Sequence, residues 1–145
     1  MSDKEAEDYY KNHEYHDRKP VYIAEDKLRP DQLERLVKSK TFCMIPWIHV
    51  HAFPNGKAFP CCLADSDHPI GDLHKNTIRE VWNDDAYKTM RKNMLEEKSC
   101  KECTKCYEQE DMGFVSMRNS TNKNFGQHIA LVDDTKPDGT FDDFK

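Results

Sequence analysis

Three cysteines at a strict interval of three residues are the feature that most constrains this chain. Cys100, Cys103 and Cys106 form a C-x2-C-x2-C series in the segment SCKECTKCYEQE. Thiols at this spacing can share one metal centre, and the lysines between them favour the thiolate forms. Three thiols do not complete a four-ligand site. We therefore expect a further donor from the other cysteines, which are Cys43, Cys61 and Cys62.

The composition limits how such a chain is stabilised. Its 145 residues are 37% hydrophobic and 34% charged, with a net charge of −5. This predicts a small core, and small domains with little core usually depend on a metal or disulfides. The acidic balance argues against nucleic-acid binding, and no apolar run is long enough to span a membrane. Because the N-terminal residues lack a secretory signal, we expect a cytoplasmic chain with reduced thiols rather than a disulfide-stapled secreted domain.

A β-hairpin is predicted over residues 42–64. Asn55-Gly56 indicates a two-residue turn, and a turn centred on this pair places Val50 opposite Cys61. The apolar face then points inward, so Cys61 is expected to be better buried than Cys62. A straight hairpin keeps Cys43 away from Cys61, but Pro46 disrupts regular pairing and allows the segment before it to turn back. The inward set comprises Ile48, Val50, Ala52, Phe59, Cys61 and Leu63.

Helices are predicted on both sides of this hairpin. A short helix begins at Pro30, and residues 70–97 read as helix with an N-cap at Asn76 and a break at 83–85. A third helix is predicted from Cys106 to Met117, weakened by Gly113. We therefore predict an α+β fold: a small irregular domain with a β-hairpin followed by two or three helices, stapled by a metal cluster. The apolar stripes are Leu33, Leu36 and Val37, then Ile78, Val81 and Trp82, then Tyr87, Met90 and Met94.

The order of these features resembles the SPASM and twitch domains of radical SAM enzymes. The resemblance rests on three phrases, FCMIPWIHVHAFPNGKAFPCC, IGDLHKNTIREVWND and CTKCYEQE, and on the spacing Cys43-x12-Gly56-x4-Cys61 followed by a helical stretch and C-x-x-C. Twitch domains bind one [4Fe–4S] cluster through four cysteines. Carried over by position, the resemblance implies Cys43, Cys61, Cys103 and Cys106 as the ligands. The longer cysteine series of a two-cluster SPASM domain is absent, so one cluster is expected.

The spacing alone leaves the ligand set open. Ferredoxin-type series use three thiolates at this spacing plus a remote one, so Cys100, Cys103 and Cys106 with Cys61 are a second possible set. Cys62 is either a spare thiol or a substitute ligand. Zinc accepts the same thiolates, and a structural four-cysteine zinc module is the alternative function. A Cys62–His49 nucleophilic pair finds little support, because no orienting third group is visible.

The resemblance also implies a partner. The chain has no C-x3-C-x2-C motif, which a radical SAM core requires, so whether it is an enzyme stays open and we do not expect it to be catalytic alone. It implies an auxiliary cluster domain that serves a radical SAM core, in cis or in trans, by electron relay or by positioning a peptide or other substrate. We expect three regions: a charged N-terminal region with a short helix at 1–40, the cluster-binding domain at 41–120, and a C-terminal tail at 121–145 leading toward the missing core.

Overall fold

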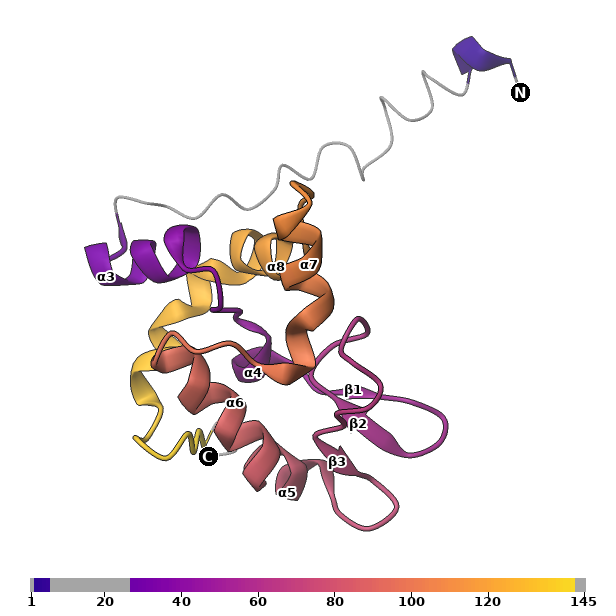
Figure 1. Cartoon of the computed structure of the whole chain (residues 1–145), viewed down its shortest axis with the longest axis vertical. Helices are drawn as coiled ribbons and strands as arrows, with labels where there is room; N and C mark the ends of the chain where they lie inside the picture. Colours follow the sequence, from indigo (N-terminus) through magenta and orange to yellow (C-terminus); the bar gives the residue numbers. More distant parts are fainter. Residues whose placement is uncertain (1, 6–26, 143–145) are drawn as a thin grey trace.

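The computed structural model describes residues 2–5 and 27–142 of the chain (Figure 1). A small sheet lies on one side of the molecule and the helices occupy the other, so the predicted α+β class is confirmed (Figure 1). Of the predicted N-terminal region, residues 1 and 6–26 lie outside the described residues. The predicted short helix is α3 (Pro30–Leu33) with a π-helical turn, η2 (Glu34–Lys38). Leu36 on this helix is buried, whereas Val37 is exposed, contrary to the predicted stripe.

The sheet has three short antiparallel strands. They are β1 (His51–Ala52), β2 (Lys57–Phe59) and β3 (Gly71–Asp72), in the order β1-β2-β3. The predicted hairpin is present, but its register is wrong by one residue: His51 pairs with Phe59, not with Pro60. Two physical causes account for the shift. Gly56 has φ +83° and closes a longer turn that carries an extra residue, and Pro60 has no N–H to donate to a ladder.

The segment before β1 is helical rather than a strand. Helix α4 (Ile45–Ile48) occupies the positions predicted for the first strand, with Pro46 in its first turn. Proline suits this position because the first N–H groups of a helix have no internal partner. The helix buries Trp47, which is not a member of the inward set of the predicted hairpin. The chain therefore changes direction at Pro46, and Cys43 is brought back toward the end of β2.

The predicted break in residues 70–97 separates two helices. Helix α5 (Ile78–Trp82) is capped by Thr77, which forms a capping box with Glu80, so the predicted cap at Asn76 is wrong by one residue. Helix α6 (Asp85–Leu95) begins after Asp84, whose side chain accepts from the N–H of Asp85. The second predicted stripe, Tyr87, Met90 and Met94, is buried. The first is buried only at Val81 and Trp82, because Ile78 faces solvent.

The predicted third helix is divided into two. A 3₁₀ turn, η3 (Lys101–Cys103), leads into α7 (Thr104–Asp111), and α8 (Met117–Phe125) follows after a turn. Gly113 has φ +85° in this turn, a conformation that a continuous helix does not contain. Ser116 caps α8 by accepting from the N–H of Asn119. A 3₁₀ helix, η4 (Gly126–Asp134), continues from α8.

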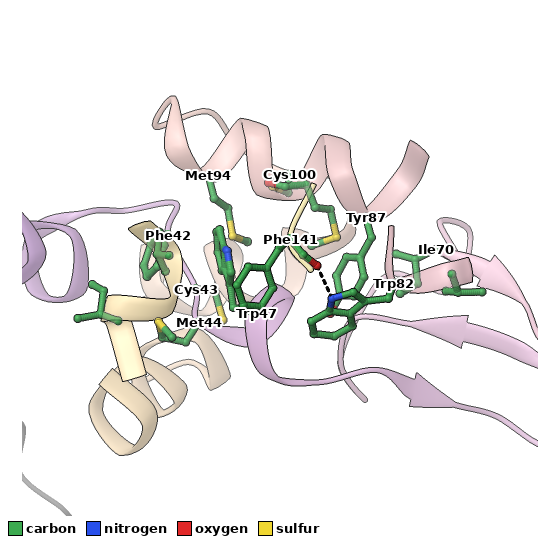
Figure 2. Close-up of a cluster of buried hydrophobic side chains, with 14 of the residues drawn as sticks. Phe42, Cys43, Met44, Trp47, Ile70, Trp82, Tyr87, Met94, Cys100 and Phe141 are labelled. Atoms are coloured by element: carbon green, nitrogen blue, oxygen red, sulfur yellow. Dashed lines mark hydrogen bonds between the residues drawn. The ribbon is translucent and has the colours of Figure 1, made fainter. Parts of the chain in front are cut away.

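The hydrophobic core contains buried residues from the helices and from the C-terminal segment. It joins α4, α5 and α6 to the C-terminal segment, and Figure 2 shows Trp47, Phe141 and Tyr87 within it. Trp82 Nε1–H donates to the carbonyl of Phe141 at 2.8 Å, the dashed line in Figure 2. Apart from one alanine and two cysteines, the buried members of this core are Leu36, Phe42, Met44, Trp47, Ile70, Val81, Trp82, Tyr87, Met90, Met94, Ile129, Val132 and Phe141.

A buried arginine lies at the centre of this core. The Arg91 guanidinium donates to the backbone carbonyls of Pro46, Trp82 and Gly139 at 2.7–3.1 Å. It also lies over the rings of Trp82, Tyr87 and Phe141. Burial lowers its pKa to about 10, so the side chain remains charged at neutral pH. One side chain thus ties α4, the end of α5 and the C-terminal segment to α6.

Candidate metal centre

Four of the six cysteines line one small cavity. They are Cys43, Cys61, Cys103 and Cys106, the set that the resemblance implied. Most of the remaining wall is apolar, and Glu102 and Arg118 are its charged members. The apolar wall residues are Ile45, Pro46, Pro60, Leu63, Met90, Met94 and Met117. A thiol-rich, mostly apolar cavity matches the chemistry of a cysteine-ligated metal centre.

Local structure places each of these thiols. Cys43 immediately precedes the turn into α4, and Cys61 follows β2, where its carbonyl accepts from the N–H of Ala64 in a tight turn. Cys103 ends η3 and Cys106 lies in the first turn of α7. Residues three apart in a helical segment share one face, so the C-x-x-C spacing directs both side chains to the same cavity.

Backbone N–H groups point at three of the four thiols. The N–H of Ile45 donates to Cys43 and the N–H of Leu63 donates to Cys61, two residues after the cysteine in each case. Cys106 accepts from the N–H groups of Met117 and Arg118, at the start of α8. Those groups have no partner inside the helix and carry the positive end of its dipole, so they stabilise negative charge on sulfur. Hydrogen bonds of this kind hold and tune the thiolate ligands of metal centres.

The fourth thiol is held by a tyrosine and a second cysteine. Tyr107 Oη–H donates to Cys103 and accepts from the N–H of Cys100 at 3.1 Å. Cys100 is buried, and its thiol donates to the carbonyl of Met90 with a sulfur–oxygen distance of 3.7 Å. Its side chain also hydrogen-bonds to Cys103 and does not line the cavity. Cys100 therefore lies behind Cys103 in this structure.

The metal-free thiols are held in their neutral forms. Burial raises the pKa of Cys61 to about 11 and raises the pKa of Cys43 and of Cys106 as well. The Cys103 thiol donates to the Cys100 sulfur, and this hydrogen bond, together with burial, raises the pKa of Cys103. Cysteine binds metals as the thiolate, so loading the site releases protons.

The cavity itself is narrow. Its volume is about 20 Å³, close to the space that one water molecule needs. Within residues 2–5 and 27–142, no three or more His, Cys, Asp or Glu side chains form a group that could hold a metal ion. The donor set and the N–H groups fit a cysteine-ligated cluster, and the cavity must widen to admit one.

Cys62 lies on a different surface. It is exposed, as predicted, and lines a wider groove of about 580 Å³ with His49, His51 and His128. Burial, with a contribution from His51, lowers the pKa of His49. Among the described side chains no hydrogen bond joins Cys62 to His49, so the nucleophilic pair gains no support. The groove also contains Cys61, so it borders the four-cysteine cavity.

The family comparison supplies the identity of this segment. Residues 43–107 match the model of the SPASM family, described as an iron–sulfur cluster-binding domain. This segment is a SPASM domain. Its bounds include all six cysteines, and the domain binds an iron–sulfur cluster. No curated protein and no solved structure gives a significant match to the chain.

The SPASM match ends before several residues that contact the site. Arg118 and Asn122 on α8 are both buried and both hydrogen-bond to the backbone next to Cys43. Sequence reasoning missed them. The available signal was their spacing of four, which places two polar side chains on one face of a helix after a Ser116 cap.

Proposed function

We propose that the SPASM domain binds one [4Fe–4S] cluster through Cys43, Cys61, Cys103 and Cys106. The observation that carries this proposal is the shared cavity, which excludes Cys62 and Cys100 from its lining. The donors at all four thiols support it further, because a cluster ligand benefits from hydrogen bonds to sulfur. The second possible set, with Cys100 in place of Cys43, requires the Cys100 thiol to leave its hydrogen bond to the Met90 carbonyl.

We further propose that the cluster serves a radical SAM core, in cis or in trans, as an electron relay. Four cysteine ligands leave no iron open, and such a cluster exchanges electrons rather than binding substrate directly. The chain itself carries no C-x3-C-x2-C motif for S-adenosylmethionine. We place this activity in the cytoplasm, where thiols stay reduced. None of the helices in the described ranges combines the length and apolar composition needed to cross a bilayer.

Substrate positioning is the second candidate role, and the groove beside Cys61 favours it. Its volume falls in the range of small-molecule sites, and three histidines and a thiol add polar groups to apolar walls. A peptide or other substrate held there would lie next to a cluster ligand. The relay requires a fully ligated cluster, whereas direct substrate binding requires an open iron.

Cysteine variants test the ligand set. We expect Cys43→Ala, Cys61→Ala, Cys103→Ala and Cys106→Ala each to remove most of the iron and acid-labile sulfide from anaerobically reconstituted protein. Cys62→Ala and Cys100→Ala should retain both, since neither thiol lines the cavity. Loss of the cluster in Cys100→Ala together with its retention in Cys43→Ala would show that the ferredoxin-type set is the correct one.

Added ligands test the two roles. If all irons are bound by cysteine, imidazole or cyanide should leave the electron paramagnetic resonance spectrum of the reduced cluster unchanged. A new signal on addition of either molecule would reveal an open iron and would favour substrate binding over relay. The Cys62→Ala variant is the control for nonspecific effects in the adjoining groove.

A further inference from the structure

Asn122 holds the backbone on both sides of Cys43. Its Nδ2 donates to the carbonyl of Phe42 at 2.9 Å, and its Oδ1 accepts from the N–H of Met44 at 3.0 Å. The Asn122 side chain is buried, with only 2% of the residue exposed. It belongs to α8, fifteen positions beyond the last residue of the SPASM match at 107.

Arg118 reinforces the same contact one turn earlier on α8. Its Nη1 donates to the carbonyls of Ser39 and Phe42, each at 2.9 Å. The guanidinium is fixed by Glu110, to which Nε donates at 2.9 Å, in a largely buried ion pair. The backbone N–H of Arg118 points at Cys106. Helix α8 therefore contacts the chain at two of the four cysteines.

Cys43 has the greatest need of such a contact. Cys103 and Cys106 are held close together by one helical segment, and Cys61 lies two residues after the end of β2. Cys43 lies in an irregular segment between η2 and α4. An amide offers a donor and an acceptor at once, so it can bond to the carbonyl before a residue and the N–H after it. An alanine or leucine at position 122 removes the acceptor of the buried Met44 N–H and leaves the Phe42 carbonyl with Arg118 as its side-chain donor.

We propose that Asn122 is a positioning residue for Cys43, and that α8 is part of the cluster site although it lies outside the family match. By fixing the backbone at Phe42 and Met44, Asn122 directs the Cys43 thiol into the cavity before the cluster binds. This inference rests on the proposed function, because the contact has a purpose only if Cys43 is a ligand.

Alkylation of the metal-free chain tests the positioning without a cluster. We compare Asn122→Ala and the milder Asn122→Ser with Asn124→Ala, a matched control at an exposed asparagine of the same helix. Iodoacetamide labelling is followed at each cysteine by mass spectrometry. Asn122→Ala should raise the rate at Cys43 about tenfold, the scale expected for losing one or two hydrogen bonds. The rate at Cys106 should change less than twofold, and Asn124→Ala should match the wild type.

Cluster retention gives the second readout. Reconstituted Asn122→Ala should lose its cluster to a chelator about tenfold faster than the wild type and Asn124→Ala. An unchanged labelling rate at Cys43 would overturn the inference. An equal increase in the labelling rate at all cysteines would also overturn it, because it would mean that the substitution destabilises the whole fold. If Asn122→Ala does not fold, Asn122→Ser decides by the same criteria. If the wild type binds no cluster, the proposed function is wrong. The labelling rate of Cys43 in the metal-free variants still tests whether Asn122 positions this residue.

Discussion

The Tyr107 hydroxyl shows how one side chain can tune the candidate centre. It donates to the Cys103 sulfur, and burial raises its pKa, so it remains a donor at neutral pH. A hydrogen bond to a ligand sulfur stabilises the reduced cluster, which carries the extra negative charge. The contribution of Tyr107 should therefore appear in the reduction potential rather than in cluster binding.

Tyr107→Phe should retain the cluster and lower its reduction potential by about 40 mV, the one-electron equivalent of a hydrogen bond worth about 1 kcal/mol. The measurement is a redox titration followed by electron paramagnetic resonance. Tyr87→Phe is the control, because the Tyr87 hydroxyl donates to backbone carbonyls of Ile45 and His49 rather than to a cysteine. A shift of the same size in both variants would contradict a specific role for Tyr107.

A second single residue, Arg91, stabilises the folded chain. Arg91→Met removes donors from three buried carbonyls, and each orphaned group costs free energy. We expect the free energy of unfolding to fall by at least about 3 kcal/mol, measured by urea denaturation. Lys92→Met changes an exposed residue on the next position of α6 and should stay within about 0.5 kcal/mol of the wild type. Equal effects of the two substitutions would rule out the central role of Arg91.

At the scale of elements, the sequence correctly predicts features that depend on residues close together in the chain. The division between α5 and α6 follows from the polar break at 83–85, and the stripe of Tyr87, Met90 and Met94 is buried as expected. The family resemblance also named the four thiols that line the cavity, a set that the cysteine spacing alone had left open. These features depend on residues close together in the chain or on a motif with fixed spacing.

The errors in the predicted structure arise where it depends on contacts between distant residues or on the unusual backbone properties of glycine and proline. The hairpin register depends on Gly56 in a left-handed conformation and on Pro60, which cannot donate. Helix α4 forms where alternation predicted a strand, because Trp47 and the Arg91 bond to Pro46 pack it against α6. No local pattern could place α8 against Cys43, since Asn122 and Met44 are 78 positions apart.

Two glycines with positive φ provide a test at this scale. A Cβ at Gly139, which has φ +93°, would lie 1.9 Å from the carbonyl oxygen of Lys88, whereas Gly113, with φ +85°, has no atom within 4 Å of that position. Gly113→Ala should cost about 1 kcal/mol from backbone strain alone. Gly139→Ala should cost clearly more and lower the melting temperature further in a thermal scan. The reverse order would contradict the packing of the C-terminal segment on α6.

At the scale of the whole molecule, the SPASM segment depends on chain beyond its own boundary. Ile129, Val132 and Phe141 are buried in the core, and α8 contacts the segment at Cys43 and Cys106. Residues from the C-terminal third of the chain therefore contribute both to the candidate metal centre and to the hydrophobic core. This arrangement predicts that the matched residues do not form a stable unit alone.

A fragment of residues 41–112 keeps the entire match and all six cysteines but lacks α8 and η4. We expect it to show much less helix than the full chain by circular dichroism, to be digested rapidly by protease, and to retain little reconstituted iron. The full chain treated in parallel is the control. A fragment that folds and holds the cluster as firmly as the full chain would show that the C-terminal residues are dispensable.

The most direct test of the account is Mössbauer spectroscopy of anaerobically reconstituted full-length protein, with iron, sulfide and zinc measured on the same sample. The account predicts the spectrum of one [4Fe–4S] cluster per chain, with matching iron and sulfide contents, and its loss in Cys43→Ala but not in Cys62→Ala. Stoichiometric zinc without sulfide, or a well-folded protein with no metal in any preparation, would contradict it.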